Sequence, residues 1–378
     1  MALINRWLNE ARDGLKKQST ILAKPFGLDL LTKAQTEDYL RPYQLASSPV
    51  HHITLSKVAD VTERSKLIFN QTEVATGHTH VWRLDNLHSD ATQLRSGGLK
   101  LGHKVLDTDF GTNALFKDLL NLKQRPDYET TMLIAPWSHY WGRYYDYLFF
   151  VAAKLCRIKD TLPASVFAEA TVAYPLLHTT FERELLAILG VRQENLIDSR
   201  THTVRFSTAI LGDNNSWFYP NPADVLSLRR YVCSVMPEPT GPGRRIYIRR
   251  SGRRRVLNED ALVALLTTYG FDIIEDQPRS IAEQVALYAG ASFIIGPHGA
   301  SFANVLWCRP GTHLLELFAD NYVPEYFRYL AELLGLRYSG YCAGLVGGSR
   351  HSHVDDDIVV SIDQFERGLN DLFRYEIA

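Results

Sequence analysis

The chain has 378 residues, a formal net charge of −1 and a hydrophobic content of 46%. This length allows two domains of ordinary size, and this hydrophobic content argues against long disordered stretches. A net charge this close to zero argues against a general nucleic-acid-binding protein. The four cysteines form no CxxC pair, which is typical of reduced thiols in a cytoplasmic protein rather than of a disulfide or zinc framework.

The N-terminal segment has an amphipathic helical pattern at residues 3–17, with apolar residues interleaved with arginines and lysines. We favour a helix packed on the protein, and a helix lying on a membrane surface is the alternative. The segment lacks a long apolar core, so we do not expect a secretory signal. Because no run of about 18 apolar residues occurs, we expect a cytoplasmic protein with at most peripheral attachment to a membrane.

The first half of the chain starts with β-hairpin patterns and continues with strands that alternate with helices. Residues 50–110 contain short strands and turns, which suggests a β-rich edge on a larger domain. Beyond them we predict helices at 144–158 and 179–191 and strands at 130–137, 165–171, 195–200 and 202–211. Residues 234–244 are rich in proline and glycine and form the clearest linker of the sequence.

After this linker, strands and helices alternate regularly. We predict strands at 244–250, 271–275, 292–296, 313–318 and 336–342, and helices at 258–270, 280–290, 301–307, 323–335 and 362–377. Asn258 is expected to cap its helix, Gly270 to end it, and Ser280 with Glu283 to form a capping box. Such alternation predicts a parallel, doubly wound α/β sheet.

A basic loop ends the strand at 244–250, where ligands of such sheets bind, beyond the carboxyl ends of the strands. Its arginines are Arg249, Arg250, Arg253, Arg254 and Arg255. Guanidinium groups bind phosphate oxygens in a bidentate manner. We favour a phosphate site here, and a solvated basic loop is the alternative.

A turn of small residues follows the strand at 292–296 and contains Gly299, Ala300 and Ser301. Glycine allows the backbone to approach a ligand, and the N–H groups that open the next helix can bind a phosphate. His298, in the same turn, is expected to donate to a phosphate oxygen. A buried structural histidine is the alternative.

Glu316 lies inside the apolar strand at 313–318, where a carboxylate needs a partner. A ribose diol would supply one, and a salt bridge to a nearby arginine is the alternative. Together, these features of the second half suggest a nucleotide-diphosphate site. The sequence has neither a GxxxxGK[ST] loop nor a GxGxxG motif after a strand, which argues against an ATPase and against a dinucleotide dehydrogenase.

Residues 245–318 resemble the C-terminal half of glycosyltransferase family 61. The shared pattern is a strand with an Arg-rich loop, then NE(D/E), then S..EQ, then GPHGA followed by an asparagine, and finally PG...LE. Residues 137–150, WSHYWGRYYDYLFF, resemble the aromatic segment of that family less closely. Arg143 stands where the histidine of the family is expected, and Asp146 keeps the acidic residue.

The resemblance implies a GT-B architecture, in which two Rossmann-like domains face each other across a cleft. It implies inverting transfer from a sugar nucleotide without an obligatory metal, and bacterial members are associated with capsule or other cell-surface polysaccharides. The donor would bind mainly to the C-terminal domain and the acceptor to the N-terminal one. The donor-site candidates on this analogy are Arg249, Arg250, Arg254, Arg255, His298, Gly299, Ala300, Asn304 and Glu316, to which Ser301 is added from the same turn.

The aromatic segment at 137–150 holds eight aromatic residues, whose faces can stack on the C–H faces of sugar rings. Inverting transfer needs a base for the acceptor hydroxyl, and we predict Asp146 in this role, with His139 as the next candidate. A helix from Tyr140 would place Arg143 and Asp146 on one face. An aromatic core helix with a structural Arg–Asp pair is the alternative.

Three parts of the chain are expected on these grounds. Residues 1–236 would form an acceptor-side α/β domain, residues 244–345 a nucleotide-sugar-binding domain, and residues 346–378 a mobile loop and a helix that packs back on the first domain. The polar residues at 350–357 are expected to lie in that loop, and a metal site is the alternative.

The leading hypothesis is a glycosyltransferase that moves a hexosyl or pentosyl group from a nucleotide-diphosphate sugar to a glycan or lipid-linked glycan. It would need no cofactor and no metal. Two alternatives stay open. One is a non-catalytic binding protein of the same fold, because Arg143 replaces the expected histidine. The other is an epimerase that acts on the nucleotide sugar itself.

Overall fold

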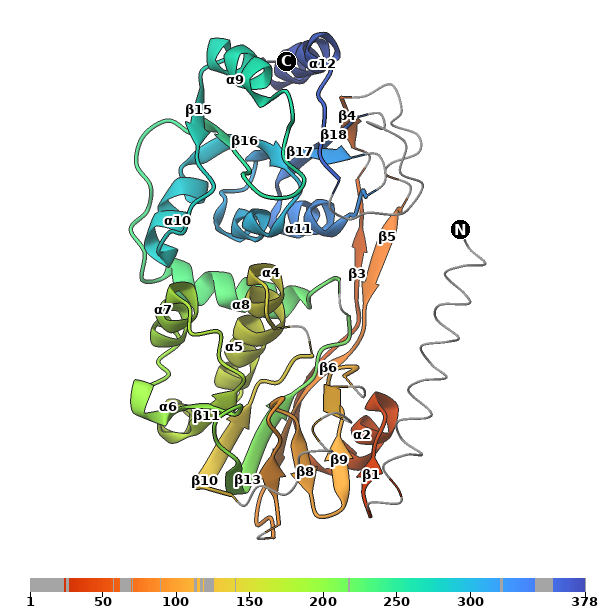
Figure 1. Ribbon diagram of the computed structural model, residues 1–378, viewed down its shortest axis with the longest axis vertical. Coiled ribbons are helices and arrows are strands. Elements are labelled where there is room, and N and C mark those ends of the chain that lie inside the picture. The colour runs from red at the N-terminus through yellow and green to blue at the C-terminus, as the bar shows by residue number, and fades with distance from the viewer. Residues whose placement is uncertain are drawn as a thin grey trace. The chain divides into compact units, whose positions relative to one another are not determined.

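The computed structural model describes residues 24, 27–56, 58–61, 69, 71–88, 90–111, 114, 115, 118, 126–139, 141–216, 218–319, 322–343 and 356–377. The chain is a mixed α/β protein (Figure 1), and it divides into two compact units. Unit 1 contains Met1–Val50 and Thr76–Val232, and unit 2 contains His51–Ala75 and Cys233–Ala378.

Unit 1 is built on a ten-stranded sheet whose parallel part carries the predicted strand–helix alternation. Its parallel strands lie in the order β13, β10, β11 and β12. Their bounds are β10 (Tyr128–Ala135), β11 (Thr171–Tyr174), β12 (Leu196–Asp198) and β13 (Val204–Gly212). The sheet also contains β1 (Asp29–Leu30), β2 (Gln44–Ser48), β6 (Thr79–Leu84), β7 (Thr92–Gln93), β8 (Leu99–Leu101) and β9 (Lys104–Leu106).

The described helices of unit 1 include those predicted at 144–158 and 179–191, which are α4 (Tyr144–Tyr147), α5 (Ala153–Asp160) and α7 (Thr180–Ile188). They also include α2 (Lys33–Leu40), α6 (Ala164–Glu169) and α8 (Pro222–Cys233), which were not predicted. A π-helical turn, Leu148–Ala152, joins α4 to α5. The strand predicted at 165–171 is wrong: Pro163 opens a helix there, since its fixed φ suits a helix start, and the strand begins at Thr171.

Unit 2 contains a six-stranded parallel sheet in the order β15, β14, β16, β17, β18 and β4. The strands are β4 (Ala59–Asp60), β14 (Arg244–Ile248), β15 (Phe271–Ile274), β16 (Ala291–Pro297), β17 (His313–Ala319) and β18 (Arg337–Ala343). A separate pair consists of β3 (His51–Thr54) and β5 (Glu73–Thr76). From β14 the chain moves outward to β15 and then returns to β16 on the other side of β14. The topological switch point, where ligands bind in such sheets, therefore lies between β14 and β16.

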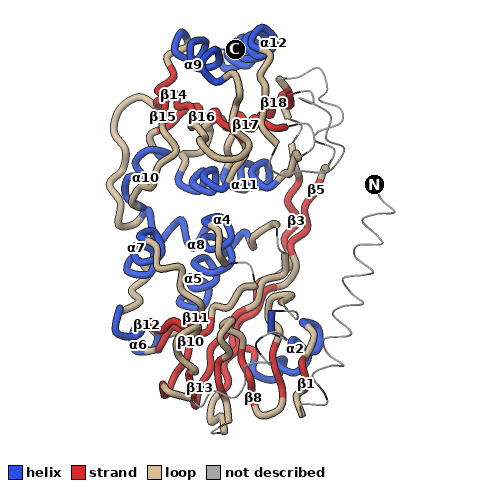
Figure 2. The backbone as a smooth tube through the Cα atoms, in the orientation of Figure 1, coloured by secondary structure: helices blue, strands red, loops and turns tan. Residues whose placement is uncertain are grey.

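Helices cover both faces of this sheet, so the predicted doubly wound arrangement is present in unit 2. Figure 2 shows α9 and α12 on one face and α10 and α11 on the other. Their bounds are α9 (Glu259–Thr268), α10 (Ile281–Ala289), α11 (Tyr326–Leu334) and α12 (Ile362–Ile377), and a 3-10 helix, η6, spans Ala300–Trp307. The capping box of Ser280 and Glu283 is confirmed, and Gly270 adopts a positive φ of 73° just past α9.

Two segments lie in a different unit from the expected one. Residues 51–75 belong to unit 2, because β4 pairs with β18 and Arg328 of α11 donates to the backbone carbonyls of Ser56 and Gln71. The helix α12 packs on unit 2 instead of returning to unit 1. Its Phe365 and Leu369 share a buried core with Leu262 of α9, as the neighbouring helices in Figure 1 indicate.

Asn258 explains part of this packing. It precedes α9 as predicted, but its side chain makes no cap. Its amide instead donates to the carbonyl of Val360 and accepts from the N–H of Val360, which fixes the segment leading into α12. The asparagine that suggested a helix cap thus makes a long-range contact instead, since a side-chain amide can serve either purpose.

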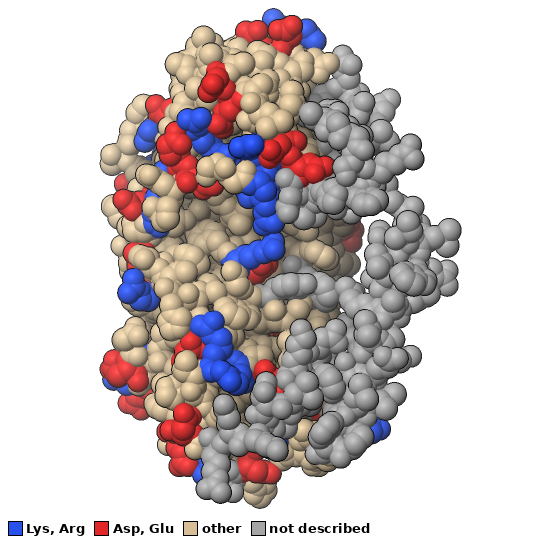
Figure 3. All heavy atoms as spheres, viewed as in Figure 1, with Lys and Arg blue, Asp and Glu red and all other residues tan. Residues whose placement is uncertain are grey.

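The charges of the two units are mixed in sign. Figure 3 shows Lys and Arg interspersed with Asp and Glu over the described part of one face, in keeping with the net charge of −1. The four cysteines are free thiols. In the part of the chain that the structure describes, no helix combines the length and the apolar character needed to cross a membrane.

Candidate active site

The loops that follow β14 and β16 meet at the switch point of unit 2. Because these strands are parallel neighbours, their carboxyl ends lie at the same edge of the sheet. Arg250, just after β14, donates from Nη1 to the carbonyl of His298 at 3.3 Å and from Nε to the carbonyl of Arg253 at 2.6 Å. The structure thus brings one predicted arginine and the predicted histidine together.

Arg254 joins them through an aromatic ring. Its guanidinium lies 5.4 Å from the ring centre of Tyr322, and this ring meets the His298 imidazole edge-on at 5.5 Å. Arg254 also has a positive φ of 60°, a conformation that is uncommon for residues with a side chain and is enriched at functional sites. Arg250, Arg254 and His298 therefore form one cluster at the switch point.

The other two predicted arginines are paired elsewhere. Arg249 bonds Glu259 at 2.8 Å and Glu275 at 3.0 Å, and Arg255 bonds Asp357 at 3.1 Å. Carboxylates of neighbouring segments already take donors of both side chains, which neither the phosphate site nor the alternative of a solvated loop predicted.

Glu316 stands behind His298, and both of its carboxylate oxygens accept from protein side chains. It is fully buried, and its Oε1 accepts from His298 Nδ1 at 2.8 Å while its Oε2 accepts from Tyr338 at 2.5 Å. Burial and the neighbouring Glu316 raise the pKa of Tyr338, so this phenol stays a donor. The chain Tyr338–Glu316–His298 fixes the imidazole and leaves its Nε2 as the ring atom for a ligand.

The small residues of the turn have separate roles. A Cβ on Gly299 would lie 1.6 Å from Nη1 of Arg250, so the glycine makes room for the guanidinium rather than for a special backbone angle. Ala300 and Ser301 open η6. Asn304 holds that helix, because its amide donates to the carbonyl of Ser301 and accepts from the indole of Trp307, both at 3.0 Å.

A second cluster lies at the carboxyl end of β10 in unit 1. The side chain of Asp109 accepts from the backbone N–H of His139 at 2.9 Å and from its Nδ1 at 3.2 Å, and both side chains are largely buried. Asp109 was not predicted. The only sequence signal was two aspartates in the turn after β9, and the distance of 30 residues hid its partner.

Asp146, in the first turn of α4, is electrostatically linked to this pair. Burial raises its pKa to about 6, against the opposing effects of Arg143 and His139 and with a further rise from Asp109. Arg143 was predicted to lie inside the helix, but it lies just before it. It precedes α4 with an extended φ of −122°, so the two residues are not a helical i, i+3 pair although their charges interact.

Comparison with known proteins identifies the family of the chain. Residues 126–315 match the sequence profile of the family Glycosyltransferase 61, which is half of the chain. This chain belongs to glycosyltransferase family 61. Xylan glycosyltransferase MUCI21 of Arabidopsis thaliana is 32% identical to it over 98 residues, which are 24% of this chain. The match spans about a fifth (20%) of the length of that relative.

The family match includes most residues of the two clusters, although Asp109 precedes it. Asp146 and His139 lie within it, and so do Arg250, Arg254 and His298. It ends one residue before Glu316, so the chain Tyr338–Glu316–His298 reaches beyond the matched segment.

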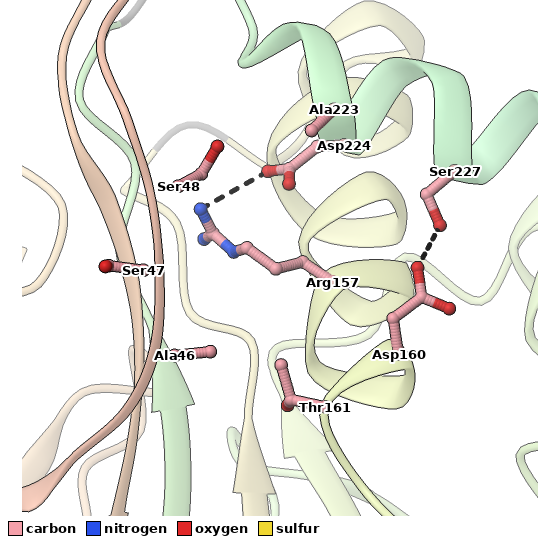
Figure 4. A pocket seen from close by; sticks show the side chains of 9 residues that line it. All are labelled: Ala46, Ser47, Ser48, Arg157, Asp160, Thr161, Ala223, Asp224 and Ser227. Carbon is pink, nitrogen blue, oxygen red and sulfur yellow. Dashed lines mark hydrogen bonds and ion pairs between the residues drawn. The ribbon is translucent and has the colours of Figure 1, made fainter.

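Unit 1 also contains a pocket, and none of the predicted site residues lines it. It measures about 160 Å³ and lies between β2, the end of α5 and the start of α8 (Figure 4). Arg157 extends into this region and lies 3.5 Å from Asp224, whose pKa burial raises to about 6. Two of the residues that line this pocket, Arg157 and Asp224, thus form a buried ion pair.

Metal ligands are not clustered in the described residues. Among them, no group of three or more His, Cys, Asp or Glu side chains has a geometry suited to a metal ion. Of the polar segment at 350–357, residues 350–355 lie outside the described residues, and Asp357 is bonded to Arg255.

Replacing Gly299 by alanine is expected to weaken nucleotide binding about tenfold with little loss of stability. The new methyl group displaces the guanidinium of Arg250, which is the flexible end of a side chain. Isothermal titration with UDP, GDP and dTDP measures the effect. Gly252→Ala is the matched control, because a Cβ there meets no atom within 4 Å. Equal affinities in the two variants would show that Arg250 does not contact the nucleotide.

Asp213→Asn is expected to destabilise unit 1 by about 2 kcal/mol at pH 7. Burial alone would raise the pKa of Asp213, but bonds from His80 and the charges of Lys33 and Arg157 outweigh it and lower the pKa to about 2. A depressed pKa stabilises the fold above about pH 4, and this contribution is lost as the pH falls toward 2. Urea unfolding at pH 7 and pH 3 measures the difference, with exposed Asp38→Asn as control. If Asp213→Asn lowers the free energy of unfolding as much at pH 3 as at pH 7, the interactions of the charged carboxylate with His80, Lys33 and Arg157 do not stabilise the fold as proposed.

Proposed function

We propose that the protein is an inverting glycosyltransferase that moves a sugar from a nucleoside-diphosphate sugar to a glycan acceptor in cell-surface polysaccharide synthesis. The observation that carries this proposal is the cluster of Arg250, Arg254 and His298 at the switch point of the unit 2 sheet. Two guanidinium groups and an imidazole beside a positive-φ loop suit the binding of a diphosphate.

The donor side supplies charge to the leaving group. In the proposed complex, Arg250 and Arg254 bind the diphosphate oxygens, and Nε2–H of the imidazolium form of His298 donates to one of them. Glu316 balances the imidazolium charge through its bond to Nδ1. Positive groups aimed at the developing negative charge lower the barrier to bond cleavage, so we propose that no metal is obligatory.

The acceptor side supplies the base. Asp146 takes the proton of the acceptor hydroxyl while its oxygen forms a bond to the anomeric carbon, and the bond from this carbon to the diphosphate breaks. A single displacement of this kind inverts the anomeric configuration. A carboxylate with a pKa of about 6 is well matched to proton transfer near neutral pH. His139, held by Asp109, is the second candidate for this role.

The architecture we propose is GT-B, with the donor on unit 2 and the acceptor on unit 1. Two separate compact α/β units support this proposal, and so does the separation of the two clusters between them. A polysaccharide acceptor is supported by the relative from Arabidopsis thaliana, which is named for xylan. The raised pKa of Asp146 favours an enzyme over a non-catalytic binding protein.

Incubation with UDP-, GDP- and dTDP-sugars tests the proposal. We expect one donor to release its nucleoside diphosphate slowly in water and faster when an acceptor glycan is added, and NMR of the product reports the inverted anomer. Nucleotide binding without any release would favour a binding protein. Conversion of the donor into its epimer would favour an epimerase.

A further inference from the structure

Loops after three neighbouring parallel strands of unit 1 bring a second group of polar and aromatic side chains together. Trp141 follows β10, His178 follows β11, and Asp198 with Arg200 ends β12. Since β10, β11 and β12 are adjacent and parallel, their carboxyl ends share one edge of the sheet, which is where ligands of such sheets bind. None of these four residues belongs to the two clusters described above.

Asp198 organises the group. It accepts from Nε2 of His178 at 2.8 Å and from Nε and Nη2 of Arg200 at 3.1 and 2.9 Å. Although burial alone would raise the pKa of Asp198, these hydrogen bonds lower it to about 2, so the carboxylate stays charged. Both partner side chains are therefore held in fixed positions.

The loop that carries His178 is held under strain. His178 has a positive φ of 57°, which costs energy for a residue with a side chain. The backbone N–H groups of Leu177 and His178 both donate to the buried carboxylate of Glu182 in α7, at 3.0 and 2.7 Å. This segment is built to present the histidine in one orientation.

The group combines a cation–π contact with exposed polar side chains. The guanidinium of Arg200 lies 5.3 Å from the ring centre of Trp141. Although Asp198 is only 8% exposed, the side chains of Arg200 and His178 are 40% and 64% exposed. Asp198 thus holds an exposed imidazole and a guanidinium that lies over an indole, which lowers the entropy lost when a ligand binds.

We propose that Trp141, His178 and Arg200 form a subsite for a neutral sugar residue of the acceptor glycan, next to the sugar that reacts. The planar groups would stack on the C–H face of the ring, and Nδ1 of His178 and the remaining N–H groups of Arg200 would bond its hydroxyls. A neutral sugar is favoured over a uronic acid, because Asp198 already cancels the charge of Arg200. This inference rests on the proposed transferase function.

The subsite is close in the fold to the proposed base. Trp141 precedes Asp146 by five residues, and Tyr144 of α4 packs edge-on against Phe181 of α7 at 5.0 Å. The helix α7 begins directly after the strained loop of His178. The subsite and Asp146 are thus carried by neighbouring segments of unit 1.

Saturation-transfer NMR with neutral tetrasaccharides tests this inference. The probes are xylotetraose, cellotetraose and maltotetraose, and tetragalacturonate serves as the acidic probe of equal length. We expect at least one neutral probe to bind the full-length protein. Its affinity should fall about tenfold in Trp141→Ala and several-fold in Arg200→Lys, which keeps the charge but loses the planar stack. Tyr43→Ala, which removes another exposed aromatic residue of unit 1, should bind like the wild type.

Three results would overturn the inference: no neutral probe binds the wild type, the acidic probe binds better than all neutral ones, or both variants bind like Tyr43→Ala. Calorimetry with UDP, GDP and dTDP on the same samples separates this inference from the proposed function. Retained nucleotide binding with unaltered oligosaccharide binding would remove only the subsite. Absent nucleotide binding in the wild type would remove the proposed function.

Discussion

Asp146→Asn is expected to lower the rate of sugar transfer by about 10²- to 10⁴-fold, the range over which a general base contributes. An amide cannot take the proton of the acceptor hydroxyl, while the proposed donor cluster of unit 2, Arg250, Arg254 and His298, is untouched. Nucleotide affinity should therefore stay at its wild-type value. Initial rates with the accepted donor, together with calorimetry, measure the two quantities.

The pH profile gives a second readout of the same residue. The base works only as a carboxylate, so wild-type activity should rise with pH and reach half of its maximum near pH 6, the pKa of Asp146. His139→Gln is the matched comparison in the same cluster, and it should lower the rate less. If Asp146→Asn keeps both the rate and the rise near pH 6, the base lies elsewhere, and a complete loss in His139→Gln would assign it to the imidazole.

His298→Ala is expected to weaken the binding of the nucleoside diphosphate by about 10- to 100-fold. A hydrogen bond to a charged group is worth roughly 1.5–3 kcal/mol, and every 1.4 kcal/mol is a factor of ten in affinity. Glu316→Gln should weaken binding about tenfold, because it removes the negative charge that stabilises the imidazolium form of His298, the group proposed to contact the diphosphate. Calorimetry with the preferred nucleotide measures both variants.

Two further variants test the second prediction more specifically: one perturbs the same hydrogen-bonded chain, and the other is a control. Tyr338→Phe keeps the ring but removes the bond to Glu316, so its effect should be smaller than that of Glu316→Gln. His52→Ala removes an exposed histidine of the same unit and should leave affinity unchanged. Wild-type affinity in both His298→Ala and Glu316→Gln would refute the donor-site assignment.

The sequence predicted that the loops of Arg250 and His298 lie at the same edge of the sheet, because the carboxyl ends of parallel strands share an edge. The alternation after the linker placed the loops of Arg250 and His298 at carboxyl strand ends, and parallel neighbours brought them together. The family was likewise predicted from these motifs, and the match over residues 126–315 confirms it.

The partners of the charged side chains could not be predicted in the same way. Arg249 and Arg255 resembled Arg250 in sequence, and only the structure shows that the start of α9 supplies a carboxylate to Arg249 and the segment before α12 one to Arg255. Glu316 required the register between β17 and β18 and the position of Tyr338 before its role behind His298 was visible. The aspartates in the turn after β9 did not indicate the partner of Asp109, because His139 is 30 residues away.

Long-range packing explains the remaining differences. The strand at Ala59–Asp60 is too short to reveal from its pattern that it joins β18, and α12 is amphipathic in a way that would suit either unit. Its apolar face is buried against α9, and contacts such as that of Asn258 with Val360 fix the choice. A periodic pattern shows which face of a helix is buried but not what buries it.

A crystal structure of the protein grown with UDP, GDP and dTDP present would decide where the leaving group binds. We expect density for two phosphates at the edge of unit 2 between β14 and β16, with oxygens within hydrogen-bonding distance of Arg250, Arg254 and Nε2 of His298. Phosphates bound at any other part of the surface, with these three side chains left in contact only with protein and solvent, would show that the donor site has been assigned to the wrong residues.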